Sequence, residues 1–233
     1  YTGLLSLNAV SRKIVTVEDP IEYQLRGINQ IQVKPQIGLD FANLLRSILR
    51  QDPDVIMVGE VRDIETAQIA VQAALTGHLV LSTLHTNDAP TAVTRLLDLG
   101  VPSYLISSTL LGVMAQRLVR TLCPHCKKPA DPPDDETWRL LTHPWRAEKP
   151  AQVMAPVGCL ECRMTGYYGR IGLFEIMPMT PTIRHLTTHE ADDAKIREQS
   201  YKDGMKPLRV SGAAKVAAGL TTAEEVIKVA PLA

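Results

Sequence analysis

Short apolar segments alternate with helical patterns over the first hundred residues, and this alternation most constrains the fold. The strand candidates are residues 13–18, 55–58 and 79–83. Between the last two, residues 64–75 have a helical period and are followed by Gly77. Buried strands that alternate with helices predict an α/β fold with a mostly parallel, doubly wound sheet. A further strand over residues 28–33 is expected to pair with residues 21–25.

Each of the three main strand candidates leads to ionisable residues. Glu60 follows residues 55–58, and Glu18 and Glu22 lie around the end of residues 13–18. His78 opens the strand candidate over residues 79–83, and His85 follows it. Ligands bind at the carboxyl edge of open α/β sheets, and a Glu there can orient water toward a phosphate or hold Mg²⁺ through water. Taken singly, these residues could be a solvated loop acid, a solvated turn or a structural histidine. Their convergence at one edge favours a single site.

Arginines accompany the acidic residues. Arg46 and Arg50 lie on the polar side of a predicted helix over residues 41–51, and Arg62 follows Glu60 closely. We expect all three to bracket the same sheet edge. There they could neutralise phosphate charge in their own subunit or in a neighbouring one.

The four cysteines form two Cys-x-x-Cys pairs, which are the most specific chemical signal in the chain. They are Cys123, Cys126, Cys159 and Cys162. In a chain that opens without a signal peptide, such pairs favour a metal over disulfides, although disulfides and an empty site remain the alternatives. Each pair can offer two thiolates to tetrahedral Zn²⁺, and four sulfur ligands would close the shell. The sequence therefore predicts structural Zn²⁺.

Changes of texture predict three domains. They are an α/β core over residues 1–120, a tetracysteine module over 121–176, and a C-terminal helical domain over 177–233. In the last domain helices are expected over 192–202, over 208–218 and from Thr222, where Thr222 and Glu225 match a capping box.

Composition excludes other classes. Lys and Arg total 25, as do Asp and Glu, so no basic field argues for nucleic acid. Every apolar run is much shorter than the roughly 20 residues that a membrane span needs. The absence of a signal peptide and of an initiator Met at Tyr1 indicates a cytoplasmic protein and a partial chain.

Several motifs in the same order resemble the type II secretion and type IV pilus assembly ATPase family. Residues 17–22 resemble its Asp box, 49–63 its Walker B segment, and 76–87 its His box. Residues 115–123 and 166–172 flank the cysteines in the family's manner. The resemblance implies a RecA-like core, a zinc module and a small helical domain, assembled as a homo-hexameric ring that hydrolyses ATP with Mg²⁺. It also implies a place at the inner face of the bacterial inner membrane, with membrane-platform proteins as partners.

The resemblance also assigns roles. Glu60 matches the Walker B glutamate, Glu18 and Glu22 the Asp-box carboxylates near Mg²⁺ and water, and His85 the residue near the γ-phosphate. The expected nucleotide or subunit-boundary residues are Arg46, Arg50, Arg62, Arg170 and His78. Because retraction ATPases of type IV pili lack the tetracysteine module, the chain resembles an assembly motor.

One departure concerns the family's phosphate-binding loop, a Gly-rich turn ending in Gly-Lys-Ser/Thr, which these 233 residues lack. Residues 1–5 match the helix that follows this loop, so a C-terminal portion that does not hydrolyse ATP alone is expected. The rival interpretation is a non-catalytic zinc scaffold that docks a membrane-platform partner. A nucleic-acid translocase is a third, disfavoured by the balanced charge.

Overall fold

The computed structural model describes residues 1–230 of the chain. Two compact units are present: one joins residues 1–111 with 179–196, and the other joins 112–178 with the chain from Arg197 onward. Helix α8 (Asp193–Lys202) belongs partly to each. The three domains predicted from the sequence follow its motifs, and their boundaries differ from those of the two compact units. The division into three domains stays a prediction, and its last three residues, 231–233, lie outside the described range.

The first unit contains a four-stranded parallel sheet in the order β2-β1-β3-β4. Its strands are β1 (Ile14–Glu18), β2 (Asn29–Gln32), β3 (Val55–Val58) and β4 (Leu79–Ser82). The predicted parallel α/β sheet is thereby confirmed. The expected pairing of 28–33 with 21–25 is wrong, because β2 pairs in parallel with β1, with Thr16 opposite Gln30.

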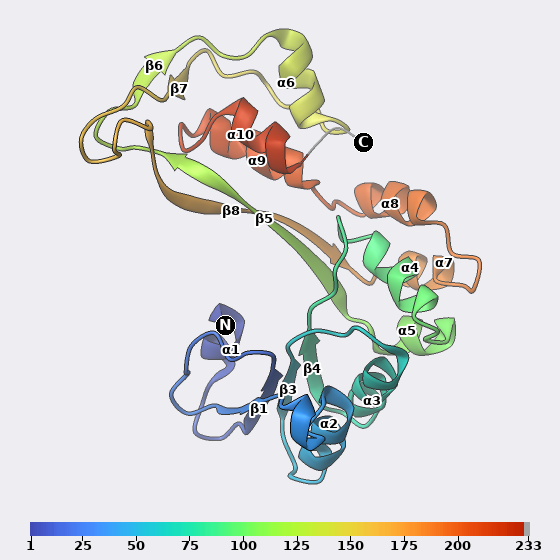
Figure 1. Cartoon of the computed structure of the whole chain (residues 1–233). Coiled ribbons are helices and arrows are strands. Elements are labelled where there is room, and N and C mark those ends of the chain that lie inside the picture. The colour runs from blue at the N-terminus through green and yellow to red at the C-terminus, as the bar shows by residue number, and fades with distance from the viewer. Residues whose placement is uncertain (231–233) are drawn as a thin grey trace. The chain divides into compact units, whose positions relative to one another are not determined.

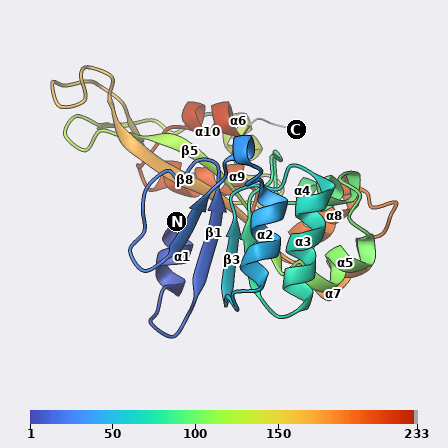
Figure 2. The same ribbon diagram turned by 60° about the horizontal axis from the view of Figure 1, so that its bottom comes forward.

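Helices lie on both sides of this sheet. The helices of this unit are α1 (Thr2–Leu7), the 3₁₀ helix Pro35–Ile37, α2 (Phe41–Leu49), α3 (Ile64–Leu75), α4 (Thr91–Asp98), α5 (Ser103–Thr109) and α7 (Pro181–Leu186). Leu4 of α1 packs with Ile14 and Val55 on one face. Side chains alternate along a strand, so the fully buried Val15 and Ile56 point to the other face, along which α2 and α3 lie side by side (Figure 2).

Local chemistry fixes where the two longest of these helices begin. The Asp40 carboxylate accepts the backbone N–H of Asn43 at 2.8 Å, and the Asp63 carboxylate accepts that of Thr66 at 2.7 Å. Helix α3 therefore starts four residues after Glu60.

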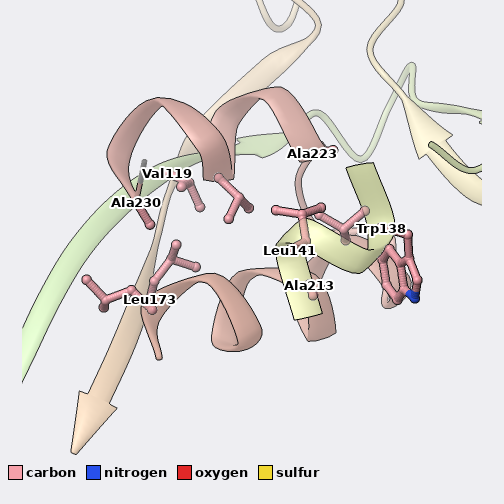
Figure 3. Packing of buried hydrophobic residues seen from close by; sticks show 10 residues of the cluster. Val119, Trp138, Leu141, Leu173, Ala213, Ala223 and Ala230 are labelled. Atoms are coloured by element: carbon pink, nitrogen blue, oxygen red, sulfur yellow. The ribbon is translucent and has the colours of Figure 1, made fainter. Parts of the chain in front are cut away.

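The second unit is built on a long antiparallel ribbon of two strands, visible in Figure 1. Its elements are β5 (Gly112–Leu122), β6 (Lys128–Ala130), α6 (Asp135–Thr142), β7 (Val153–Ala155), β8 (Tyr167–Pro178), α9 (Leu208–Ala217) and α10 (Ala223–Val229). Strand β5 pairs with β8, and β6 pairs with β7. Figure 3 shows the core of this unit, where Val119 and Leu173 of the ribbon meet Leu141 of α6 and the two helices α9 and α10. None of the helices described over residues 1–230 combines the length and apolarity that crossing a bilayer requires.

Candidate active site and metal site

Three sequence-predicted acids and bases lie at the carboxyl edge of the parallel sheet. Glu18 is the last residue of β1, Glu60 follows β3 by two residues, and His85 follows β4 by three. Since these strands are parallel and hydrogen-bonded to one another, their exits share one edge. The expected convergence of these residues is therefore present.

One backbone and one side-chain hydrogen bond fix the strand exits relative to one another. The Gly59 N–H donates to the Val17 carbonyl at 2.7 Å, and the Thr83 hydroxyl donates to the Gly59 carbonyl at 2.7 Å. A Cβ at position 59 would lie 3.1 Å from the Val17 carbonyl oxygen, which is tighter than ordinary contact. Glycine thus allows the chain to pass close to β1 immediately before Glu60.

Glu60 is the centre of a charged cluster. One of its carboxylate oxygens forms an ion pair with Arg62, and the other lies 3.0 Å from His85 Nε2. The Glu60 side chain is 13% exposed, whereas His85 is 87% exposed. The hydrogen bond from Arg62, supported by that from His85, lowers the pKa of Glu60. Glu60 is therefore a carboxylate at neutral pH, suited to orienting a water or holding charge rather than storing a proton.

Two acidic residues at this edge stabilise the charged form of Arg62. Its hydrogen bond with Glu60 raises the pKa of Arg62, and the negative charge of Asp19 raises it further. Asp19 directly follows Glu18, so the positive charge of Arg62 interacts both with the acidic residue after β1 and with Glu60. The structure thus brings Arg62 to the edge as expected.

Glu18 and Glu22 have different surroundings. Glu18 is 3% exposed, and its carboxylate accepts hydrogen bonds from Tyr1 Oη, Thr16 Oγ1 and, at 2.9 Å, Gln30 Nε2. The Glu22 side chain is exposed, and its backbone N–H donates to Tyr1 Oη at 3.2 Å. Glu18 is thus held rigidly, while Glu22 faces solvent.

Two predicted residues lie away from this edge. His78 directly precedes β4, and its Nδ1 lies 2.9 Å from the Ala73 carbonyl oxygen. Arg50 caps the C-terminus of α2, next to Gln51, whose carbonyl accepts a hydrogen bond from Lys13 just before β1. Both positions are at the amino ends of the strands. The expectation that Arg50 brackets the carboxyl edge is corrected, because α2 runs antiparallel to the strands.

Arg46 lies between two helices. It forms an ion pair of 2.5 Å with Glu65 in the first turn of α3, and both side chains are about half exposed, at 48% and 59%. The pair joins α2 to α3 at the surface of the unit. A role of Arg46 toward nucleotide stays a prediction.

The four cysteines of the second unit form one cluster. All four sulfurs lie within 4.8 Å of one another. Three of the separations are 3.9 Å for Cys123–Cys159, 3.8 Å for Cys126–Cys162 and 3.7 Å for Cys159–Cys162. A tetrahedron with metal–sulfur bonds of about 2.3 Å has edges of about 3.8 Å. The cluster fits a tetrahedral metal ion with four sulfur ligands.

Backbone donors prepare this cluster for negative charge. The Cys159 and Gly166 N–H groups each lie 3.2 Å from Cys162 Sγ, and the Gly158 N–H lies 3.3 Å from Cys126 Sγ. Burial opposes the thiolate of Cys162, yet the N–H donors of Cys159 and Gly166, with hydrogen bonds from the Cys159 and Cys126 thiols, lower its pKa to about 6. A backbone hydrogen bond from Cys162 opposes a raised pKa at Cys159, but burial and the hydrogen bonds with the neighbouring sulfurs raise the pKa of Cys159 to about 11. In the metal-free cluster Cys162 is therefore the favoured thiolate, and Cys159 keeps its proton. Metal binding requires the thiolate form, so the N–H donors favour it.

Some contributors were not identified from the sequence. Tyr1, Thr16 and Gln30, which hold Glu18, come from three separate segments, and the period-2 spacing of Thr16 and Glu18 is the only local signal among them. Arg170 lies on β8 opposite Arg120, in the unit that contains the cysteines.

Comparisons with known proteins agree with the motifs. The family described as "Type II/IV secretion system protein" matches residues 1–228. The type IV pilus assembly ATPase TfpB of Acinetobacter baylyi is 51% identical over 232 residues, covering 100% of this chain and 40% of that protein. The type II secretion system ATPase E of Vibrio cholerae is 50% identical over 229 residues, covering 98% and 45%. The chain thus spans less than half the length of these relatives.

A solved structure of a related motor also matches this chain. The crystal structure of the pilus retraction motor PilT with bound ADP has a TM-score of 0.68 and 28% identity, covering 98% of this chain and 55% of that one. The match extends over nearly all of the chain, including both compact units.

Proposed function

The chain belongs to the type II/IV secretion system protein family, and from that premise we propose that it is the C-terminal part of an ATP-hydrolysing motor. The motor would power type II protein secretion or type IV pilus assembly, the processes named for its relatives of about 50% identity. The observation that carries the proposal is the Glu60 carboxylate, held between Arg62 and His85 at the carboxyl edge of a parallel sheet.

The residues at this edge suit phosphoryl transfer to water. Glu60 stays ionised and can orient the attacking water. The His85 side chain is exposed and can therefore contact the phosphate of a bound nucleotide. Mg²⁺, which prefers carboxylate and water oxygens, would neutralise phosphate charge when bound. Glu18 and Glu22 are the carboxylates proposed to hold it, directly or through water.

The remaining arginines and His78 are proposed to act between subunits. Arg50 and His78 lie at the amino ends of the strands, so they are assigned to a nucleotide on a neighbouring copy of a homo-hexameric ring. Arg46 and Arg170 are proposed to serve the same boundary. This proposal extends to a cytoplasmic ring at the inner face of the inner membrane, with platform proteins as partners.

The cysteine cluster is proposed to hold structural Zn²⁺. Its sulfur separations match the tetrahedral ion, and a closed shell of four thiolates leaves no position for a substrate. The same cluster supports the alternative function, a zinc-containing scaffold that docks a membrane-platform partner without catalysis.

The test is Glu60→Gln in the full-length protein that carries this chain. Gln keeps the shape but loses the charge, so ATP should still bind while turnover falls about a hundredfold or more. Glu198→Gln removes an exposed charge paired with Lys202 and serves as the control. Near-normal turnover in Glu60→Gln would place the essential acid at Glu18 or Glu22.

A polypeptide of residues 1–233 alone should not hydrolyse ATP. Its sequence contains no Gly-Lys-Ser/Thr loop, whose N–H groups and Lys cradle the phosphates that Glu60 would act on. ATPase assays of this polypeptide beside the full-length protein test the point. If neither hydrolyses ATP, the scaffold becomes the better interpretation.

A further inference from the structure

The Glu18 carboxylate is enclosed by donors from three elements. Thr16 and Glu18 point to the same face of β1, and Gln30 lies opposite Thr16 on β2. Tyr1, which precedes α1, reaches the same carboxylate from above this face. The side-chain hydroxyl of Thr16, the amide of Gln30 and the phenol of Tyr1 all donate to it.

Tyr1 also contacts the chain that follows Glu18. Its hydroxyl donates to Glu18 Oε2 and accepts the Glu22 backbone N–H at 3.2 Å. One hydroxyl therefore links the carboxylate of the buried Glu18 to the backbone of the exposed Glu22. The Tyr1 ring packs against Tyr23, with centroids 4.4 Å apart, which limits its movement.

We infer that Tyr1 is a positioning residue for the proposed ATPase site, with Gln30 as its counterpart on the opposite side of the Glu18 carboxylate. The inference rests on the proposed function. Tyr1 does not touch the reacting atoms in this assignment. Its hydroxyl fixes the rotamer of Glu18 and the path of the chain from Glu18 to Glu22, so that both carboxylates meet Mg²⁺ and water in one arrangement.

Gln30 is itself held in place, because its Oε1 accepts the Leu25 N–H at 2.6 Å and fixes which end of the amide faces Glu18.

The experiment uses the full-length protein with Tyr1→Phe, Gln30→Met and the control Tyr23→Phe. Tyr1→Phe keeps the ring and removes only the bridging hydroxyl. We expect kcat for ATP hydrolysis to fall about tenfold with KM changed less than about twofold, because a misplaced carboxylate slows turnover more than it weakens binding. Gln30→Met should show the same split, while Tyr23→Phe, which keeps the stacked ring, should behave as wild type.

The thermal unfolding temperature of each variant separates positioning from stability. A fall in kcat at an unchanged unfolding temperature supports the inference, and should Tyr1→Phe not fold, Gln30→Met decides. Wild-type kcat in both variants, a raised KM with unchanged kcat, or a loss of activity matching the loss of folded protein overturns it. If the wild-type protein itself lacks ATPase activity, the proposed function fails, and this inference fails with it.

Discussion

The ion pair between Arg120 and Glu225 joins β5 to α10 across 105 residues of sequence. Arg120 Nε and Nη2 donate to the two carboxylate oxygens at 2.9 and 2.6 Å, and Lys228 Nζ approaches one of them at 3.0 Å. The Glu225 side chain is only 7% exposed. The hydrogen bond from Arg120, followed by that from Lys228, lowers the pKa of Glu225 from 4.5 to about 2.

This pKa shift gives the magnitude of the expected effect. A fall from 4.5 to about 2 corresponds to at most about 3.5 kcal/mol, since each pKa unit is about 1.4 kcal/mol. Water screens the pair, because 48% of the Arg120 side chain is exposed, so we expect about 1–2 kcal/mol. The folded-state pKa is depressed, so this stability is fully present above about pH 4.5 and is lost as the pH falls toward 2.

Glu225→Gln should therefore lower the free energy of unfolding by about 1–2 kcal/mol at pH 7, with the difference from wild type shrinking between pH 4.5 and 2. Urea unfolding followed by tryptophan fluorescence reports on the right part of the chain, because Trp138 and Trp145 both lie in the second unit. Glu224→Gln removes the same charge from an exposed position in the same helical turn. Equal losses in the two variants at pH 7, or a Glu225→Gln difference that stays constant down to pH 3, would refute the reasoning.

Two further changes test the second unit. Freshly reduced protein should contain about one zinc per chain with sulfur-only coordination at about 2.3 Å. Cys159→Ser should lower the zinc content, measured by metal analysis, and destabilise the second unit, measured by hydrogen exchange. A metal-free reduced protein would contradict this prediction. Gly212→Ala should destabilise the unit by about 1–3 kcal/mol in urea unfolding, because its Cβ would lie 2.3 Å from Val226 Cγ1. Gly3→Ala, with nothing within 4 Å, is the control, and equal stability of the two variants would rule out the packing argument.

Local patterns predicted much of the first unit. The strand over 55–58 and the helix over 64–75 occur with the expected bounds, because continuous apolar runs and a helical period with an Asp cap are properties of neighbouring residues. The carboxyl-edge cluster was also predictable. Parallel strands must bring their ends to one edge, so no knowledge of packing was needed to place Glu18 near Glu60.

The ribbon of β5 and β8 was not predicted, and the expected boundary near residue 120 falls inside β5. Part of its apolar surface is exposed, as at Met114 (61%), Phe174 (42%) and Ile176 (55%). A clean alternation of buried apolar and exposed polar residues is the usual sequence signal of such strands. This ribbon lacks that signal, and its two strands pair across more than forty residues.

Glu225 shows why local motifs leave partners undetermined. As expected, the Thr222 hydroxyl accepts the Glu225 N–H, at 3.4 Å, so the first half of the capping box is present. The carboxylate itself pairs with Arg120. A bidentate guanidinium binds a carboxylate more strongly than one backbone N–H does, and only the tertiary fold brings Arg120 within reach. Glu18 follows the same rule: its position is set by the strand, whereas Tyr1 and Gln30 reach it only because α1 and β2 pack beside β1. Sequence patterns thus identify the acids of this site, and the folded chain determines which donors hold them.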